Sequence, residues 1–121
     1  VYCPKEGRIN PLLAVNAFGS IDGDGTGLDD IEAEVGALAA PGPLGNTTIG
    51  VIATNASLDK VGCLVVAQGG HDGLGRAIVP AHSRVDGDAL VALSAGAVEA
   101  PVDLVRVLAV AAVERAVRSL A

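Results

Sequence analysis

Runs of apolar residues, separated by polar segments rich in Gly and Pro, divide the chain into short strands and longer helices. Segments 11–19, 47–54 and 89–94 are apolar and short, which predicts buried strands. Apolar residues recur at helical spacing over residues 58–78 and again from Pro101 to about residue 120, which predicts two helices. Residues 1–10 combine Pro4 and Gly7 with charged side chains, so we expect a loop there.

The first predicted helix has one apolar face, made by Leu64, Ala67, His71, Leu74 and Ile78. Ser57 is the expected N-cap, with Asp59 in the first turn. Gly69 and Gly70 fall mid-helix, where each costs about 1 kcal/mol relative to Ala. We therefore expect either close packing against another backbone or a kink. His71 is expected to be a satisfied core residue rather than a catalytic base.

The second predicted helix begins at Pro101 and has Asp103 in its first turn, where the helix dipole favours a carboxylate. Glu114 and Arg118 are four residues apart and are expected to pair on the outer face. Its apolar stripe comprises Leu104, Val107, Leu108, Ala111 and Ala112.

Residues 20–46 are expected to connect the first strand to the second as an exposed linker with a short amphipathic helix over 28–40. The stretch from Asp22 begins like a calcium-binding loop, with oxygen ligands at alternate positions and a glycine at the sixth. Its twelfth position is Ala33, where calcium loops need a bidentate Glu. A polar Gly/Asp turn is the better interpretation, and no metal site is expected.

Composition restricts the class of partner. The chain has 121 residues, a formal net charge of -6, one Tyr and one Phe, so it lacks the charge and the aromatic surface for binding nucleic acid. No apolar run is long enough to span a bilayer, and no signal peptide is visible. Cys3 and Cys63 are expected to be reduced thiols of a cytoplasmic protein. The chain opens on Val1 without an initiator Met, so we expect one domain or a piece of a longer protein.

Gly45-Asn46-Thr47-Thr48 carries the candidate chemistry. Thr47 opens an apolar strand directly after a Pro- and Gly-rich segment, the setting of a self-cleaving precursor. A threonine at a newly formed N-terminus has a hydroxyl nucleophile and an α-amine that can act as its base. On residue types alone, a simple boundary between loop and strand is the commoner explanation.

Two other polar positions allow alternatives. Asp86-Gly87-Asp88 is either a tight turn or a pair of carboxylates that converge on one site, where each would shift the pKa of the other. Asn16, within an apolar strand, is either a satisfied buried amide or a turn residue.

Several segments together resemble one protein family. They are Asn16-Ala17-Phe18-Gly19, Gly45 to Ile49 with Ala53-Thr54-Asn55, His71-Asp72-Gly73-Leu74 with Arg76-Ala77-Ile78, and Ala81-His82 with Asp86-Gly87-Asp88. In order and spacing, the chain resembles the C-terminal part of the L-aminopeptidase/D-amidase/D-esterase family of N-terminal-nucleophile hydrolases, which includes the nylon-oligomer hydrolases. The resemblance implies an α+β fold that forms part of a four-layer αββα sandwich, of the type shared with ornithine acetyltransferases.

The same resemblance implies self-cleavage between Asn46 and Thr47. Residues 1–46 would end the α chain, with a strand at 11–19 and a linker at 20–46, and residues 47–121 would form the β chain. The two chains of one precursor stay associated in this family, usually as tetramers.

The resemblance also implies catalytic roles. Thr47 is the nucleophile that forms an acyl-enzyme on an amide or ester substrate, and its α-amine is the general base. Asn16 corresponds to the amide that stabilises the oxyanion, and Asp86 and Asp88 to the acidic pair that orients the nucleophile. No cofactor or metal is implied, and His82 is taken as structural.

The chain departs from the family in one respect. Family members are much longer and carry a catalytic lysine on an upstream strand, for which neither Lys5 nor Lys60 is a match. Two alternatives therefore stand beside the self-processing amidase or aminopeptidase: a non-catalytic remnant of the family, and an acyltransferase of the ornithine acetyltransferase type.

Overall fold

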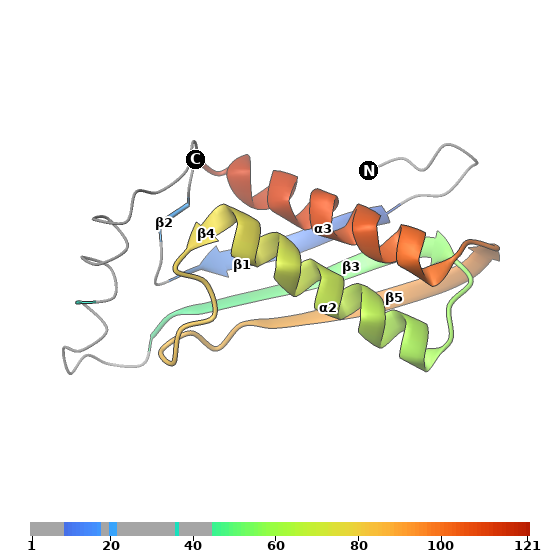
Figure 1. The fold of residues 1–121 in the computed structure, drawn as a ribbon, viewed down its shortest axis with the longest axis horizontal. Helices are drawn as coiled ribbons and strands as arrows, with labels where there is room; N and C mark the ends of the chain where they lie inside the picture. The colour runs from blue at the N-terminus through green and yellow to red at the C-terminus, as the bar shows by residue number, and fades with distance from the viewer. Residues whose placement is uncertain (1–8, 18–19, 22–35, 37–44) are drawn as a thin grey trace.

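The structure, a computed structural model, describes residues 9–17, 20–21, 36 and 45–121 (Figure 1). The elements in chain order are β1 (Ile9–Asn16), β2 (Ser20–Ile21), β3 (Thr47–Ala56), α2 (Lys60–Ala77), β4 (Ile78–Val79), β5 (Ala89–Val98) and α3 (Val102–Arg118). The calcium-like segment 22–33, Cys3 and all of the predicted helix 28–40 except Gly36 lie outside the described residues.

β1, β3 and β5 form one three-stranded sheet in that order. β1 runs antiparallel to β3, whereas β5 runs parallel to it, with α2 in the crossover between them. The short strands β2 and β4 form a separate antiparallel pair. Because β3 and β5 are parallel, the residues that precede them, Asn46 and Asp86, meet at the same end of the sheet and form a parallel bridge.

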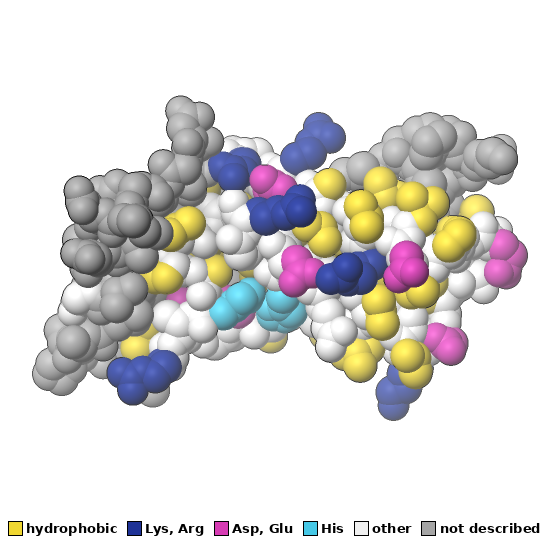
Figure 2. All heavy atoms as spheres, in the orientation of Figure 1, with side chains coloured by type: hydrophobic (Ala, Val, Ile, Leu, Met, Phe, Trp, Pro, Cys, Tyr) yellow, Lys and Arg dark blue, Asp and Glu magenta, His cyan; other side chains and the backbone are white. Residues whose placement is uncertain are grey.

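Both helices lie on one face of the sheet (Figure 1), α2 packing against β5 and α3 against β1. The core between the layers is built from small and medium side chains, including Ile52, Val66, Leu74, Val113 and Val117, which are all fully buried. Figure 2 shows charged side chains gathered along the line where the two helices meet, and the paired charges there are Arg106–Asp72, Arg76–Glu114 and Glu114–Arg118. The predicted pair of Glu114 and Arg118 is confirmed, with Arg118 Nε 3.2 Å from Glu114 Oε1.

Of the two alternatives predicted for Gly69 and Gly70, close packing is found and a kink is not. The neighbours of Gly69 include the backbone of α3, whereas a β-carbon on Gly70 would meet the side chains of Ile52 and Leu90. A β-carbon on Gly69 would lie 3.0 Å from the carbonyl oxygen of Arg106, and one on Gly73 would lie 2.6 Å from that of Val110. Helix α2 therefore approaches the backbone of α3 along a stripe of glycines, without a break between residues 60 and 77.

The opposite face of the sheet is apolar and exposed. Leu12, Ile49, Val91 and Leu93 are exposed by 77%, 53%, 53% and 57%. The first three of these, together with Leu13, Ala14 and Val51, line a shallow apolar hollow. One helical layer on one sheet gives an α+β fold that is consistent with part of an αββα sandwich, as predicted.

Several predicted boundaries were wrong. The first strand begins at Ile9, inside the predicted loop 1–10, and ends at Asn16; Phe18 and Gly19 lie outside the described residues. Pro11 is tolerated because β1 is an edge strand. The predicted linker 20–46 contains β2, which pairs with β4.

The predicted helix cap was also wrong. Asp59, not Ser57, is the N-cap of α2, and its carboxylate accepts from the Gly62 amide at 2.7 Å. The Ser57 N–H instead donates to Val98 and the Leu58 N–H to Ser94 Oγ, so both residues are held by β5 and the helix begins later.

The predicted helix faces were correct only in part. Ala67, Leu74 and Ile78 of the first face and Ala112 of the second are buried. Leu64 is 57% exposed and Val107 60% exposed, and Leu104 is also exposed, although all three were placed on the apolar faces. The buried face of α2 is made largely of Gly and Ala, and that of α3 contains Val105, Ala109 and Val113.

Candidate active site

The peptide bond between Asn46 and Thr47 lies at the start of β3. The loop before β5 lies at the same end of the sheet, because the crossover makes β5 parallel to β3. The Asn46 carbonyl oxygen accepts a hydrogen bond from the Gly87 amide at 3.0 Å. The Thr47 hydroxyl donates to the same oxygen at 2.6 Å. Two donors from different parts of the chain therefore hold this one carbonyl group.

Gly87 is in close contact with Thr47. A β-carbon on Gly87 would lie 3.0 Å from Thr47 Oγ1, tighter than ordinary van der Waals contact. Glycine at this position thus lets the loop approach the hydroxyl and reach the carbonyl with its N–H.

Asn16 lies directly opposite Thr47 in the ladder between β1 and β3. Directly opposed residues of an antiparallel pair project from the same face of the sheet, and both side chains are exposed. Asn16 Nδ2 donates to the Gly45 carbonyl oxygen at 2.9 Å. The amide therefore binds the segment immediately before the candidate cleavage site.

Asp88 is tied to the strand that carries Thr47. Its Oδ1 accepts from the Thr48 backbone N–H at 2.9 Å, and its Oδ2 is 2.8 Å from His82 Nδ1. The Asp88 side chain is only 7% exposed, so its carboxylate depends on these partners for satisfaction.

Asp86 is held within its own loop. Ser83 Oγ donates to Asp86 Oδ2 at 2.7 Å, and the Asp86 N–H donates to the Ser83 carbonyl at 3.1 Å. The backbone of Asp86 also bridges to Asn46. Asp86 and Asp88 thus flank the Gly87 amide that reaches the Asn46 carbonyl.

The two histidines of the chain lie side by side next to Asp88 (cyan in Figure 2), with ring centroids 5.0 Å apart. His82 Nε2 is 3.2 Å from the His71 carbonyl oxygen. Burial and the neighbouring His82 lower the pKa of His71, against smaller raising effects from Asp88 and Asp72. His71 is half-buried on α2, while His82 contacts a residue of the candidate site.

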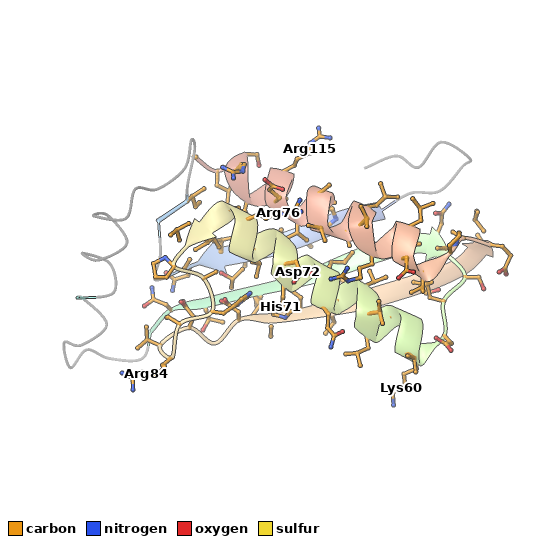
Figure 3. The ribbon with its side chains drawn as sticks, in the orientation of Figure 1. Lys60, His71, Asp72, Arg76, Arg84 and Arg115 are labelled. Carbon is orange, nitrogen blue, oxygen red and sulfur yellow. The ribbon has the colours of Figure 1, made fainter. Side chains whose placement is uncertain are left out.

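Asn16, Asn46, Thr47 and Asp88, predicted from segments far apart in the sequence, thus gather at one end of the sheet. Sequence reasoning missed the Gly87 amide, Ser83 and His82, because backbone donors and loop contacts leave no residue pattern. Lys60 begins α2 at the other end of the molecule from Arg84 of the loop before β5 (Figure 3). Within the described residues, no group of three or more His, Cys, Asp or Glu could hold a metal ion.

Comparison with known proteins places this chain in a family. The profile of peptidase family S58 matches residues 6–120. The chain belongs to this peptidase family, and the suspected resemblance is confirmed.

Relatives carry the name of aminopeptidases. The chain is 42% identical over 113 residues to uncharacterized aminopeptidases of Mycobacterium tuberculosis and Mycobacterium bovis, covering 77% of the chain and 33% of each relative. It is 56% identical over 55 residues to an uncharacterized aminopeptidase of Mycobacterium leprae, covering 46% of the chain and 15% of the relative. The chain spans about a third of the length of the Mycobacterium tuberculosis and Mycobacterium bovis relatives. None of the helices in the described residues is both long and apolar enough to cross a membrane.

Proposed function

We propose that this chain is the nucleophile-bearing part of a self-processing amide hydrolase, with Thr47 as the nucleophile. The observation that carries the proposal is the double hydrogen bonding of the Asn46 carbonyl by Thr47 Oγ1 at 2.6 Å and by the Gly87 N–H at 3.0 Å. Membership of a peptidase family and the aminopeptidase names of the relatives support the reaction class.

Self-cleavage begins with attack of Thr47 Oγ on the Asn46 carbonyl carbon. The C–O bond forms, the C–N bond between Asn46 and Thr47 breaks, and the hydroxyl proton is transferred to the departing amine. The product is an ester between Asn46 and the Thr47 side chain. Water then hydrolyses this ester to leave the Asn46 carboxylate and a threonine with a free hydroxyl and a free amine.

The Gly87 amide stabilises the charge that develops during this attack. Negative charge accumulates on the Asn46 carbonyl oxygen in the transition state, and the Gly87 N–H already donates to that oxygen. Asp88 accepts the Thr48 N–H and so fixes the backbone beside the nucleophile.

The free threonine then acts on substrates. Its hydroxyl attacks an amide or ester carbonyl to form an acyl-enzyme, with the α-amine as general base. In the uncleaved chain the Asn16 amide is bonded to the Gly45 carbonyl. Release of that segment frees Asn16 to donate to the substrate oxyanion, and Asp86 and Asp88 orient the new terminus. The substrate is a small amide, ester or peptide, and the assembly is a homo-oligomer of the two-chain product.

The test of self-cleavage is mass spectrometry of the protein expressed from its complete reading frame. We expect two pieces, the second with the N-terminal sequence Thr-Thr-Ile-Gly of residues 47–50. Thr47→Ala abolishes the cleavage because it removes the attacking oxygen. Thr48→Val is the matched control, because the Thr48 side chain is fully buried and its backbone N–H, which binds Asp88, is retained. An intact wild-type mass in folded protein contradicts the proposal and favours a non-catalytic remnant.

Gly87→Ala gives a second prediction about the same bond. The new methyl group would crowd Thr47 Oγ1, which lies 3.0 Å from the position of the added carbon. Ala retains the backbone N–H, but this crowding displaces it from the Asn46 carbonyl, and we expect self-cleavage to slow by about 10²-fold, the effect of losing one oxyanion donor. Gel densitometry of the two pieces over time measures this rate, and a wild-type rate in Gly87→Ala would exclude a role for this close approach.

A further inference from the structure

His82 links the candidate site to helix α2. Its Nδ1 lies 2.8 Å from Asp88 Oδ2, and its Nε2 lies 3.2 Å from the backbone carbonyl of His71. A carboxylate only accepts hydrogen bonds, so the contact with Asp88 requires an N–H at Nδ1 of the ring. The ring also packs against that of His71.

The backbone of His82 is held in an unfavourable conformation. Its φ of 56° is the only positive value at a non-glycine residue within the described part of the chain. Left-handed backbone is uncommon at residues other than Gly, although Asn, Asp and His adopt it more often than most, and it persists where surrounding contacts require it. Here the contacts that accompany it are those of the ring with Asp88 and α2.

Asp88 connects this ring to the nucleophile strand. The carboxylate is 7% exposed, and its other oxygen accepts the Thr48 N–H at 2.9 Å. With Oδ2 bound by His82, rotation of the carboxylate away from Thr48 would break a second hydrogen bond in a largely buried site. The chain of contacts therefore runs from the His71 carbonyl through His82 and Asp88 to Thr48, next to Thr47.

We propose that His82 is a positioning residue that locks the Asp88 carboxylate onto the Thr48 amide and thereby fixes Thr47 for reaction. The effect of His82 on reactivity rests on the proposed function of Thr47. The effect of His82 on the hydrogen bond between Asp88 and the Thr48 N–H is independent of that function. The two parts are tested separately.

The first experiment measures the contact without any cleavage. In a Thr47→Ala background, amide hydrogen exchange by NMR reports the Thr48 N–H. We expect His82→Gly to accelerate Thr48 exchange by about tenfold, as for the loss of one ordinary hydrogen bond. His82→Asn retains protection, because Asn tolerates left-handed backbone and places an N–H donor where Nδ1 was.

Controls separate this effect from general loosening of the loop. Arg84→Gly introduces a glycine at an exposed position of the same loop and leaves Thr48 exchange unchanged. Ile52, fully buried in the middle of β3, is the internal reference for the sheet. If His82→Gly also accelerates exchange of the Ile52 amide, His82→Asp is used in place of His82→Gly. Asp has the same size as Asn but lacks its N–H donor. The proposal is overturned if the variant without the donor leaves protection of the Thr48 amide unchanged. It is also overturned if His82→Asn loses as much Thr48 protection as that variant.

The second experiment measures the self-cleavage rate of the complete reading frame. We expect His82→Gly to slow cleavage by about tenfold and His82→Asn to restore most of the rate. In an Asp88→Asn background, His82→Gly has no further effect, because His82 acts through Asp88. If His82→Gly slows cleavage about tenfold again in the Asp88→Asn background, the proposal is overturned. Absence of wild-type cleavage together with the expected exchange pattern instead rejects the proposed function and leaves the positioning contact established.

Discussion

At the scale of single residues, the loop before β5 organises the candidate site through its own internal contacts. Ser83 fixes the Asp86 carboxylate, His82 fixes that of Asp88, and the amide between these aspartates reaches the Asn46 carbonyl. His71 supports the loop from α2 through its backbone carbonyl and its ring. The titration of His71 should therefore be visible in the stability of the whole chain.

The lowered pKa of His71 predicts a loss of stability in mild acid. Below the ordinary His pKa of 6.5, the unfolded state binds a proton that the folded state resists, so the free energy of unfolding falls as pH decreases through this range. Above 6.5 both states are neutral at this residue and the contribution is complete. Urea unfolding from pH 7.5 to pH 5 should show a smaller decrease for His71→Gln than for wild type. Equal pH dependence would contradict the expectation.

The sequence predicted the residues of the site better than their contacts. The spacing of Asn16, Thr47 and Asp88 led to the family, but their proximity depends on the antiparallel pairing of β1 and the parallel pairing of β5 with β3. The contact between His82 and Asp88 depends on a positive φ, which residue types at that position do not indicate. The sequence therefore does not indicate this contact, and His82 is taken as structural there because the family resemblance gives it no clear role.

At the scale of elements, the two helices show why apolar periodicity located them correctly but identified their buried faces only in part. The pattern counted large side chains such as Leu64 and Val107, both of which are exposed. The closest packing uses glycines, which a hydrophobic pattern does not weigh, so the core face of α2 is rotated toward Gly69 and Gly73. Element positions followed from the sequence, whereas element faces required the packing.

Gly73→Ala and Gly75→Ala form a matched pair that tests this packing. A β-carbon on Gly73 would meet Val110 O at 2.6 Å and Val113 Cβ at 2.9 Å, and we expect destabilisation of about 1–3 kcal/mol. A β-carbon on Gly75 meets nothing within 4 Å, and we expect a gain of up to about 1 kcal/mol from helix propensity. Chemical denaturation measures both; stabilisation by Gly73→Ala would show that the helices can separate at little cost.

At the scale of the whole molecule, the dominant feature is the uncovered apolar face of the sheet. Leu12, Ile49 and Val91 would be unusual as a continuous exposed patch on a monomeric protein. β5 is an edge strand of the sheet that the described residues form, and strand edges without a partner favour association with other chains. The relatives, about three times the matched length, have further chain with which to cover such a face.

The 121-residue chain made by itself should self-associate through this face. We expect Val91→Lys with Leu93→Lys to shift it toward monomer in sedimentation velocity, because both side chains are exposed on the edge strand and charge opposes edge pairing. Val107→Lys on α3, at an equally exposed position, is the control and should leave the distribution unchanged. If Val107→Lys shifts the chain toward monomer to the same extent, the association does not use this face of the sheet specifically.

The position of β1 has a consequence for refolding. All eight of its residues pair with β3, across the bond proposed to break, and α3 packs against it. A cut after Asn46 would leave this strand attached only by non-covalent contacts, so a folding reaction that is unimolecular before the cut becomes bimolecular afterwards. The intact chain would then refold at a rate independent of protein concentration, whereas the processed pieces would recombine more slowly on dilution.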